Sequence, residues 1–469
     1  MKNDLKNKLM MRVKNIHFIG IGGSGMSGIA SILNDMGYII SGSDMNSSRT
    51  TDALLQKDIK ISIGHNKDNI ISKDVVVISS AIKKDNIEYV YAKELNIPVL
   101  KRAEMLAELM KFSYGIAIAG THGKTTTTSI LSHILSEANY DPTYIIGGKI
   151  INLSNAKLGS GDYLVAEADE SDASFLHLQP MISLVTNIDK DHLENHDNSF
   201  DVLKKNFIEF INNLPFYGLC LLNKGDINTL SVINKISRPI KTFGIDVEAD
   251  YIASSTVLTD ISAKYTYTEN NKEYEMQLNM PGEHNILNSL AALAIAREIN
   301  VPIKTIQKSF KNFPGINRRF EIIKNIEIDN KVFSWVDDYG HHPSEMKEVL
   351  NTIKNVWENK KIVMIFQPHR YSRTAEHFSQ FIEILKNVDD LAIMDIYPAN
   401  EEPIENITSK ALITELKKYN NEFVLLNENE DLIQYINKAI TQDSILLTMG
   451  AGNISKFVNY YKNFHQIKS

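Results

Sequence analysis

The sequence predicts an α/β protein with three domains, in which helices cover mainly parallel sheets. The chain has 469 residues, and a domain usually has roughly 150. Short apolar strands alternate with helical patterns, which is typical of parallel sheets. Glycine-rich or polar segments follow many of these strands, at the sheet edge where ligands of open α/β folds bind. We therefore place the domains at residues 1–112, 113–318 and 319–469.

Each domain is predicted from its own series of strands. The first series begins with Ile16–Ile19 and includes Val75–Ile78. The second contains Gly115–Ala119, Tyr163–Ala166 and Ile182–Val185, and it closes near Arg318 after a helix over Ile286–Ile299; the polar, alternating segment 250–280 is predicted to add antiparallel strands. The third contains Lys361–Phe366, Leu391–Met394 and Ser444–Thr448.

Composition excludes several classes of protein. Apolar residues make up 43% and charged residues 23%, which is ordinary for a globular enzyme. The net charge of −7 and the scattered basic residues argue against a nucleic-acid partner. Cys220 is the single cysteine, no signal peptide is legible in the first 14 residues, and no apolar run reaches membrane-spanning length. We expect a cytoplasmic protein without a membrane partner, either a monomer or a weak homodimer.

A first glycine-rich loop, Gly20-Ile21-Gly22-Gly23-Ser24-Gly25, lies between a strand and a helix that runs from Met26 onward. Glycines let the backbone approach a diphosphate, and the helix N-terminus offers free N–H groups. Asp44 ends the next strand, where a ribose-binding acid is expected. By itself the pattern favours NAD, and a tight turn without a ligand is the alternative.

A second loop, Gly120-Thr121-His122-Gly123-Lys124-Thr125, also joins a strand to a helix. It departs from the strict P-loop pattern because Ile118 stands where the first glycine belongs. Backbone N–H groups are expected to wrap phosphates, Lys124 to neutralise β/γ charge, and Thr125 to ligate magnesium. A polar helix cap before a threonine run is the alternative. Together the two loops predict two phosphorylated ligands.

Polar side chains at other strand ends extend the predicted site. Glu167 heads an acidic segment that could hold the magnesium of ATP, although such a segment is often only solvated. His192 could bind a second cation or orient phosphate. Asn285 and Asn288 lie three apart on one helical face, which suggests hydrogen bonds to a polar group, although helix capping explains Asn285 nearly as well.

The C-terminal third carries further candidates. Arg318 and Arg319 stand at the predicted domain junction, where they could reach phosphates or form a surface ion pair. Arg370 and Arg373 suit fork-shaped pairing with the carboxylate of a free amino acid. The adjacent pair His341-His342 is a weak candidate for a transition-metal site, because adjacent residues rarely converge on one ion.

In combination these motifs resemble the Mur ligase family over essentially the whole chain after residue 12. The motifs are Gly20–Gly28, Gly120–Thr128, Glu167–Asp172, Thr186–His192, His284–Asn288, Arg318–Phe320, Asp337–Pro343 and Phe366–Thr374. The resemblance implies an N-terminal Rossmann-like UDP-binding domain, a central P-loop ATPase domain and a C-terminal Rossmann-like domain. It also implies that the first loop binds UDP rather than NAD.

The resemblance implies ATP-dependent ligation of L-alanine to the lactyl carboxylate of UDP-N-acetylmuramate through an acyl phosphate, in peptidoglycan precursor synthesis. ATP and magnesium are the implied cofactors. A recycling ligase that adds a tripeptide to the same UDP-sugar is the nearest alternative. An NAD-dependent oxidoreductase and a non-catalytic nucleotide-sensing switch are alternatives from other classes.

The resemblance also assigns roles to individual residues. It implies that Lys124, Glu167, His192, Asn285, Arg319 and Asp338 are catalytic, and that Thr125, Glu167 and His192 hold metal. The implied ATP site comprises Gly120, Thr121, His122, Gly123, Lys124, Thr125, Thr126, Asn285, Arg319 and Asp338. The implied UDP-sugar site comprises Gly20, Gly22, Gly23, Ser24, Gly25, Met26, Asp44, His65, Ser79, Ser80 and Arg102. Tyr339, His341, Arg370 and Arg373 are implied to bind the amino acid.

Overall fold

The computed structural model describes residues 10, 12–148, 150–151, 154–328, 330–399, 401–420 and 422–465, and of Ser24 the backbone only. Most of the first 14 residues, for which no signal peptide is predicted, therefore lie outside the described part. The chain forms two compact units. Unit 1 comprises Met1–Ser254, Thr266–Met276 and Leu287–Phe313, and unit 2 comprises Ser255–Tyr265, Gln277–Ile286 and Pro314–Ser469.

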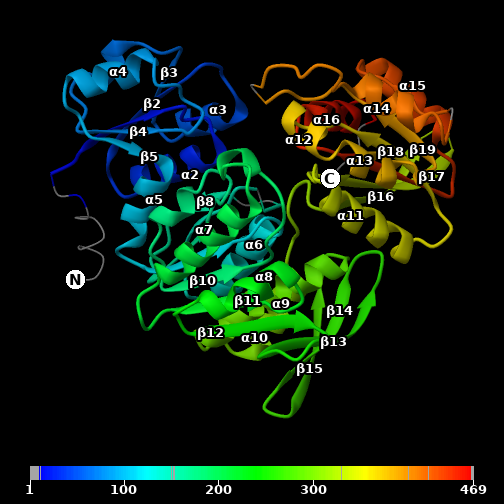
Figure 1. Ribbon diagram of the computed structural model, residues 1–469, viewed down its shortest axis with the longest axis horizontal. Coiled ribbons are helices and arrows are strands. Elements are labelled where there is room, and N and C mark those ends of the chain that lie inside the picture. Colours follow the sequence, from blue (N-terminus) through cyan, green and yellow to red (C-terminus); the bar gives the residue numbers. More distant parts are fainter. Residues whose placement is uncertain are drawn as a thin grey trace. The chain divides into compact units, whose positions relative to one another are not determined.

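The first sheet, in unit 1, has five parallel strands in the order β3-β2-β1-β4-β5 (Figure 1). Its strands are β1 (Asn15–Ile19), β2 (Ile39–Asp44), β3 (Lys60–Ile63), β4 (Val75–Ile78) and β5 (Val99–Lys101). The connecting helices are α2 (Ser24–Asp35), α3 (Arg49–Leu55), α4 (Ile87–Glu94) and α5 (Arg102–Met110).

Alternation along β1 explains why helices cover both faces of this sheet. Ile16 and Phe18 belong to one buried cluster with residues of α2 and α5. Ile19 belongs to a second cluster with Ala92 of α4. Because successive side chains of a strand point to opposite faces, His17 faces the same side as Ile19.

The central sheet has ten strands in the order β15-β14-β13-β12-β11-β10-β6-β9-β7-β8. Strands β13 to β7 in this order are parallel, and β8 is antiparallel to β7. The strands are β6 (Tyr114–Ala119), β7 (Thr143–Ile145), β8 (Ala156–Lys157), β9 (Tyr163–Glu167), β10 (Ile182–Val185), β11 (Leu219–Asn223), β12 (Ile240–Ile245), β13 (Tyr251–Leu258), β14 (Ala263–Glu269) and β15 (Lys272–Leu278). The helices are α6 (Lys124–Glu137), α7 (Phe200–Asn212), α8 (Ile227–Val232), α9 (Glu283–Glu298) and α10 (Ile303–Asn312).

The third sheet, in unit 2, has the order β16-β17-β21-β18-β19-β20, and only the edge strand β16 is antiparallel to its neighbour. The strands are β16 (Glu321–Ile328), β17 (Lys331–Asp338), β18 (Lys361–Phe366), β19 (Asp390–Ile393), β20 (Val424–Leu425) and β21 (Ser444–Met449). The helices are α11 (Pro343–Val356), α12 (Tyr371–Glu376), α13 (Phe378–Leu385), α14 (Ser409–Leu416), α15 (Asn429–Ala439) and α16 (Ile454–Phe464).

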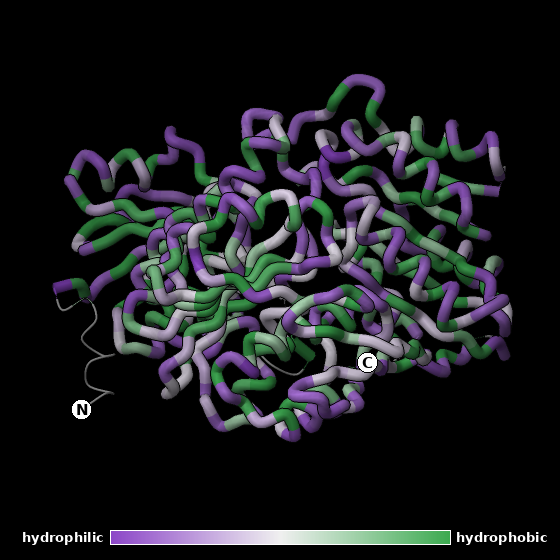
Figure 2. The backbone as a smooth tube through the Cα atoms, turned by 60° about the horizontal axis from the view of Figure 1, so that its bottom comes forward, coloured by the Kyte–Doolittle hydropathy of each residue, from purple (hydrophilic) through white to green (hydrophobic). Residues whose placement is uncertain are grey.

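Alternation recurs in β18, where Met364 packs with α11, α13 and α14 while Ile365 packs with α15 and α16. Along the tube in Figure 2 the hydrophobic colour gathers in such strands, whereas many connecting turns are hydrophilic. Within the described residues, no helix combines the length and the apolar character that crossing a bilayer requires.

The predicted three-domain α/β fold is confirmed, with one sheet for each domain. Segment 250–280 does add strands, β13 to β15, to the central sheet. The predicted antiparallel orientation is wrong for β13, which pairs with β12 in parallel. The antiparallel edge strand β16 was not predicted. Its sequence, with charged residues between isoleucines, lacks the continuous apolar run that marked the buried strands. The exact domain boundaries stay a prediction.

Candidate active site

The Gly120 loop connects β6 to α6 in a backbone conformation that only glycine adopts easily. Gly120 has φ +125° and Gly123 has φ +85°. A Cβ atom at Gly120 would collide with the hydroxyl of Thr186, and one at Gly123 would collide with Asn288. Among the described residues, no side chain caps the start of α6, so its first N–H groups remain available to an anion.

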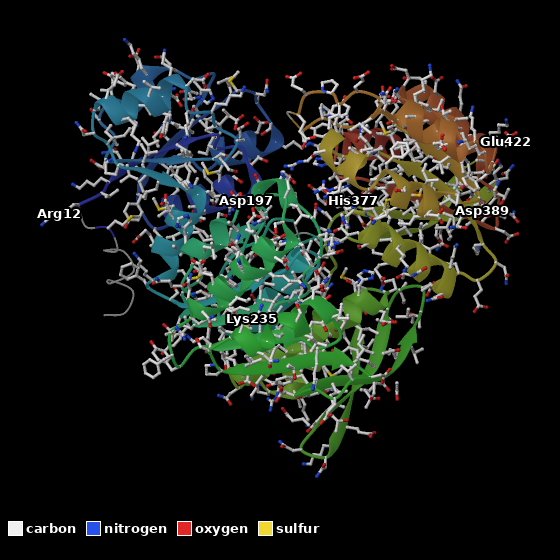
Figure 3. The ribbon with its side chains drawn as sticks, in the orientation of Figure 1. Arg12, Asp197, Lys235, His377, Asp389 and Glu422 are labelled. Carbon is white, nitrogen blue, oxygen red and sulfur yellow. The ribbon has the colours of Figure 1, made fainter. Side chains whose placement is uncertain are left out.

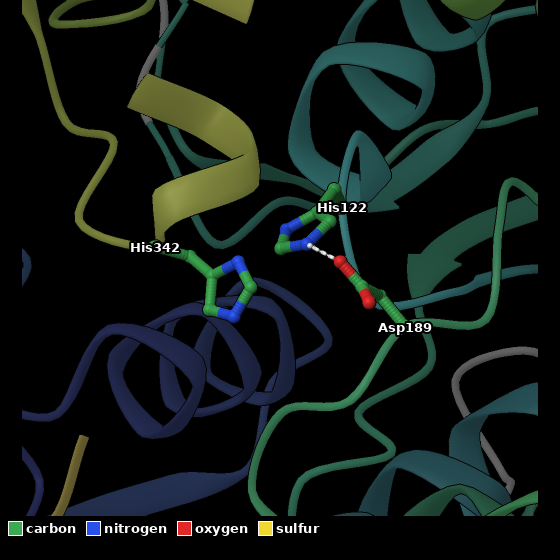
Figure 4. A group of neighbouring side chains, drawn as sticks. All are labelled: His122, Asp189 and His342. Atoms are coloured by element: carbon green, nitrogen blue, oxygen red, sulfur yellow. Dashed lines mark hydrogen bonds and ion pairs between the residues drawn. The ribbon is translucent and has the colours of Figure 1, made fainter. Parts of the chain in front are cut away.

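The segment after β10 braces this loop. Thr186 donates its hydroxyl proton to the carbonyl oxygen of His122 at 2.5 Å. The N–H of His122 donates to Oδ1 of Asn187 at 2.9 Å, and the N–H of Asp189 donates to the hydroxyl of Thr121 at 2.9 Å. The Nε2 atom of His122 lies 3.2 Å from Oδ2 of Asp189 (Figure 4). The His122 side chain therefore contacts the segment after β10 that holds the Gly120 loop.

Lys124 is the cation of the loop. Its Nζ donates to the carbonyl oxygens of Gly120 at 2.5 Å and Thr121 at 3.1 Å. It also lies 2.9 and 2.7 Å from the two carboxylate oxygens of Glu170. Burial lowers the pKa of the Lys124 ammonium, but the Glu170 and Asp169 carboxylates outweigh burial and raise that pKa above its usual value. Lys124 therefore stays protonated.

The predicted metal ligands lie at the ends of adjacent strands. In the order β10-β6-β9, Glu167 ends β9, Thr125 follows β6 in the first turn of α6, and His192 follows β10. The carboxylate of Glu167 accepts the N–H of Gly147 at 2.6 Å. His192 has φ +54° and lies between two carboxylates, Asp191 at 3.5 Å and Glu194 at 3.7 Å.

Two threonines and two asparagines complete the predicted nucleotide region. Thr126, which follows Thr125, is buried. Oδ1 of Asn288, in unit 1, accepts the hydroxyl proton of Thr127 at 3.2 Å and lies beside Gly123. Asn288 is thus bonded to a polar partner, as its spacing suggested. Asn285, in unit 2, donates to the carbonyl oxygen of Pro281 at 2.7 Å, which is a bond local to the start of its helix.

The Gly20 loop has a different chemistry because it contains no lysine. Gly20 has φ +79°, and the N–H of Gly22 donates to Oδ2 of Asp44 at 2.9 Å. Gly23 caps α2 without a side-chain hydrogen bond. The side chain of Met26 is buried in the core, so only its backbone can face a ligand.

The other residues implied for the UDP-sugar site surround the Gly20 loop. A Cβ at Gly25 would meet the Arg102 side chain at 2.9 Å, and a Cβ at Gly20 would meet that of Ser79 at 3.1 Å. Arg102 also donates to Asp169 at 3.2 Å, which links the first loop to the acidic segment after β9. Ser80, next to Ser79, is exposed.

His65 belongs to a buried network in the first domain. Its Nδ1 lies 3.1 Å from Oε2 of Glu88 and 3.1 Å from the hydroxyl of Ser43. Burial raises the pKa of Glu88, but the nearby ring of His17, at 3.6 Å, and hydrogen bonds from Asn69 and Ser43 outweigh it and lower the pKa to about 2. Nδ1 of His65 is thus committed to the protein, which leaves Nε2 for a ligand.

In unit 2, Arg319 and Asp338 lie near the end of β17. Asp338 accepts the N–H groups of Phe320 and Gly340, each at 2.7 Å. Burial raises the pKa of Asp338 to about 6 although Arg319 opposes the shift. Arg319 lies 5.0 Å from the ring centre of Tyr339, and its neighbour Arg318 pairs with Asp337 at 3.0 Å.

The predicted amino-acid residues of unit 2 are partly brought together by a histidine that was not predicted. The ring of His369 lies 5.3 Å from that of His341, and its Nδ1 lies 3.3 Å from Arg373. The Tyr339 ring contacts His341 edge-on at 5.5 Å. Arg370 instead points to Glu401, at 3.8 Å.

His342 is held by His377, labelled in Figure 3, and their Nε2 atoms are 3.2 Å apart. The N–H of Ser344 donates to Nδ1 of His342 at 3.3 Å, and Nδ1 of His377 lies 3.1 Å from the amide oxygen of Gln380. His342 caps the start of α11, which explains its position.

Three features of the site escaped sequence reasoning. Glu170 stands in the noted acidic segment, but nothing local marks it as the partner of Lys124. His369 lies in the segment Gln367–Arg373, in which only the arginines were predicted to bind a ligand. The Gly450 loop after β21 has φ +144° at Gly450, and this strand–glycine–helix signal could have been read from Gly450-Ala451-Gly452-Asn453.

A lysine-bearing glycine loop and acidic strand ends on one sheet, with a second glycine loop on another parallel sheet, define a nucleotide-dependent enzyme. Family models match the chain in three consecutive parts: Mur ligase family, catalytic domain, at residues 15–114; Mur ligase middle domain at 118–296; and Mur ligase, glutamate ligase domain, at 318–452. The chain belongs to the Mur ligase family.

Individual relatives agree over nearly the full length. The UDP-N-acetylmuramate–L-alanine ligase of Vesicomyosocius okutanii is 48% identical over 457 residues, covering 96% of this chain and 97% of that protein. The ligase of the same name from Hydrogenovibrio crunogenus is 45% identical over 454 residues, covering 96% and 98%.

Solved structures give the same picture. The UDP-N-acetylmuramate–alanine ligase of Thermotoga maritima has a TM-score of 0.80 at 30% identity, covering 96% of this chain and 100% of that one. A murein peptide ligase of Psychrobacter arcticus has a TM-score of 0.71 at 23% identity, covering 97% and 99%. At that lower identity the likeness shows the fold alone.

Proposed function

We propose that this protein joins L-alanine to the lactyl carboxylate of UDP-N-acetylmuramate at the expense of ATP, in peptidoglycan precursor synthesis. The proposal is carried by 45–48% identity over nearly the whole chain to ligases of that name. The two loops add chemical support, since one offers glycine N–H groups with Asp44 and the other offers N–H groups with Lys124.

The proposed reaction begins with in-line attack of a lactyl carboxylate oxygen on the γ-phosphorus of ATP. This forms an acyl phosphate and releases ADP. The amine of alanine then attacks the acyl carbon, and the tetrahedral intermediate collapses to the amide and inorganic phosphate. Transfer of this kind depends mainly on positioning and charge stabilisation. Lys124 of the Gly120 loop and the uncapped start of α6 can supply this positioning and charge stabilisation.

Magnesium is part of the proposal. Thr125 and Glu167 offer the hard oxygen donors that magnesium prefers, and His192 lies between two carboxylates. These three residues would hold the metal, which supplies neutralisation of phosphate charge when bound. Thr121, His122, Thr126, Asn285, Arg319 and Asp338 are proposed to complete the ATP site.

The remaining roles follow the same proposal. Gly20, Gly22, Gly23, Ser24, Gly25, Met26, Asp44, His65, Ser79, Ser80 and Arg102 would bind the UDP-sugar. Tyr339, His341, Arg370 and Arg373 would bind alanine, with His369 as their neighbour. A cytoplasmic location and a monomer or weak homodimer stay predictions.

Phosphate release tests the assignment. The full chain is incubated with ATP, magnesium and UDP-N-acetylmuramate, and L-alanine, glycine, L-serine, D-glutamate and a tripeptide are compared. L-Alanine should give the fastest release, with some use of glycine and L-serine because one methyl group contributes only about 1–3 kcal/mol to discrimination. Release that does not depend on alanine, or that prefers the tripeptide, would overturn the proposal.

A further inference from the structure

A buried carboxylate, Glu170, is paired with the lysine of the phosphate loop. The Glu170 side chain is 4% exposed, whereas that of Lys124 is 17% exposed. The Lys124 Nζ lies within 3 Å of both oxygens of this carboxylate, at 2.9 and 2.7 Å. The contact joins residues from the loops that follow two neighbouring strands, β6 and β9.

This pairing leaves the ammonium of Lys124 without a spare donor. A lysine has three N–H donors. Within the described residues, the carbonyl oxygens of Gly120 and Thr121 take two, at 2.5 and 3.1 Å, and Glu170 takes the third. Phosphate oxygens can bind Lys124 only if one of these acceptors is replaced. Glu170 is the anionic one, so its exchange for phosphate preserves charge compensation.

Hydrogen bonds to its carbonyl oxygen hold the backbone of Glu170 in place. Its carbonyl oxygen lies 3.0 Å from Nε2 of the buried His196, and a carbonyl only accepts, so Nε2 carries the proton. Nδ1 of His196 then accepts from the side-chain amide of Asn206, at 2.9 Å. The N–H of Ala173 donates to the same carbonyl oxygen at 3.0 Å. The backbone of Glu170 is therefore anchored, and its carboxylate is directed at Lys124.

We propose that Glu170 is a positioning residue that holds Lys124 in the nucleotide-free protein and is exchanged for phosphate oxygens when ATP binds. The carboxylate stands in for a phosphate and spares the protein an unpaired, largely buried ammonium. It also competes with ATP, since each anion must displace the other from Lys124. The inference rests on the proposed use of ATP at this loop but not on the identity of the amino acid.

The test measures ATP-Mg binding to the full chain by calorimetry, without UDP-sugar or amino acid. Glu170→Gln keeps the shape of the side chain and removes its charge, so the Kd for ATP should fall on the order of tenfold. Asp172→Asn is the matched control, because Asp172 is exposed in the same segment and caps the N–H of Ser174. Its Kd should stay within about twofold, since exposed charges are screened.

Thermal unfolding gives a second readout. Without nucleotide, Glu170→Gln should melt below the unchanged protein, and saturating ATP-Mg should abolish the difference, because the pair no longer exists in the complex. Glu170→Asp, which retracts the carboxylate by one methylene, should tighten ATP binding by an intermediate factor, and it serves if Glu170→Gln does not fold.

Unchanged or weaker ATP binding by Glu170→Gln, or a melting deficit that persists in saturating ATP, would overturn the proposal. Either result would mean that the pair survives in the complex or is purely structural. Failure of alanine-dependent phosphate release would leave these binding measurements interpretable, so the two proposals can fail separately.

Discussion

The two glycine loops of unit 1 share a strand–glycine–helix design but differ in the charges around them. The Gly20 loop has an anion, Asp44, on its own N–H group and no cation of its own. The Gly120 loop carries Lys124, balanced by buried Glu170. The same order of strand, glycine loop and helix therefore serves loops of different charge. A loop without a lysine can hold a diphosphate that does not react, whereas transfer of a γ-phosphate requires a positioned cation.

Two buried glutamates sharpen this comparison. Glu88, in the first domain, accepts hydrogen bonds from several partners, and its pKa is lowered to about 2. Burial raises the pKa of Glu170, although the positive charge of Lys124 opposes this shift. Several hydrogen bonds thus stabilise the carboxylate of Glu88. The carboxylate of Glu170 instead pairs with Lys124, which is also proposed to bind phosphate.

The largest expected effect comes from removing the cation of the second loop. Lys124→Met should lower kcat/KM for phosphate release roughly a thousandfold, about 4 kcal/mol, because a preorganised charge is lost from the transferring phosphate. UDP-sugar binding, followed by calorimetry, should not change. A variant that keeps its rate, or that loses UDP-sugar affinity equally, would remove the distinction between the loops.

Glu88→Gln should cost the first domain about 3 kcal/mol of unfolding free energy at pH 7, because the lowered carboxylate pKa is lost. A carboxylate with a folded pKa of about 2 against 4.5 unfolded stabilises fully above pH 4.5 and progressively less as the pH falls towards 2. The melting temperatures of the variant and the unchanged protein should therefore converge as the pH falls from 4.5 towards 2. Parallel curves would contradict this role; Glu94→Gln, exposed on the same helix, is the control.

Gly120→Ala should weaken ATP binding by about 2 kcal/mol, because alanine is strained at φ +125° and its Cβ collides with Thr186. The matched change in the first loop, Gly22→Ala, brings a Cβ to 2.8 Å from Asp44 and should raise the KM for the UDP-sugar instead. Steady-state kinetics with each substrate varied separates the two. If either variant affects both substrates alike, the loops do not serve separate ligands.

The smallest effect is expected from Asp44→Asn. The variant keeps an oxygen for the N–H of Gly22 but loses its charge. Binding of the UDP-sugar should weaken by about 1 kcal/mol, which raises its KM roughly fivefold. The KM for ATP and kcat should stay unchanged. A selective loss of ATP affinity would count against the assignment of the Gly20 loop to the UDP-sugar.

Local patterns predicted the strands and the loops well. Strand β4 begins and ends at the predicted residues, and Asp44, Glu167 and Lys124 stand at strand or helix ends as expected. These features depend on side-chain alternation and glycine placement within a few residues, which a sequence displays directly.

Pairings across the sequence were not predictable in the same way. The Lys124–Glu170 contact spans 46 residues and the Thr127–Asn288 bond 161, and each depends on how strands are ordered in the sheet. His369 was missed because its neighbours Arg370 and Arg373 suit the expected carboxylate better. Local sequence therefore indicated which residues carry the chemistry, but not which side chains hold them in place.

Transfer of an oxygen atom tests the central account most directly. UDP-N-acetylmuramate labelled with ¹⁸O in the lactyl carboxylate is turned over with ATP, magnesium and L-alanine, and the released phosphate is analysed by mass spectrometry. Attack of the carboxylate on the γ-phosphate predicts one ¹⁸O atom in each phosphate released. Unlabelled phosphate would show that water, and not the carboxylate, receives the phosphoryl group, and would contradict the account.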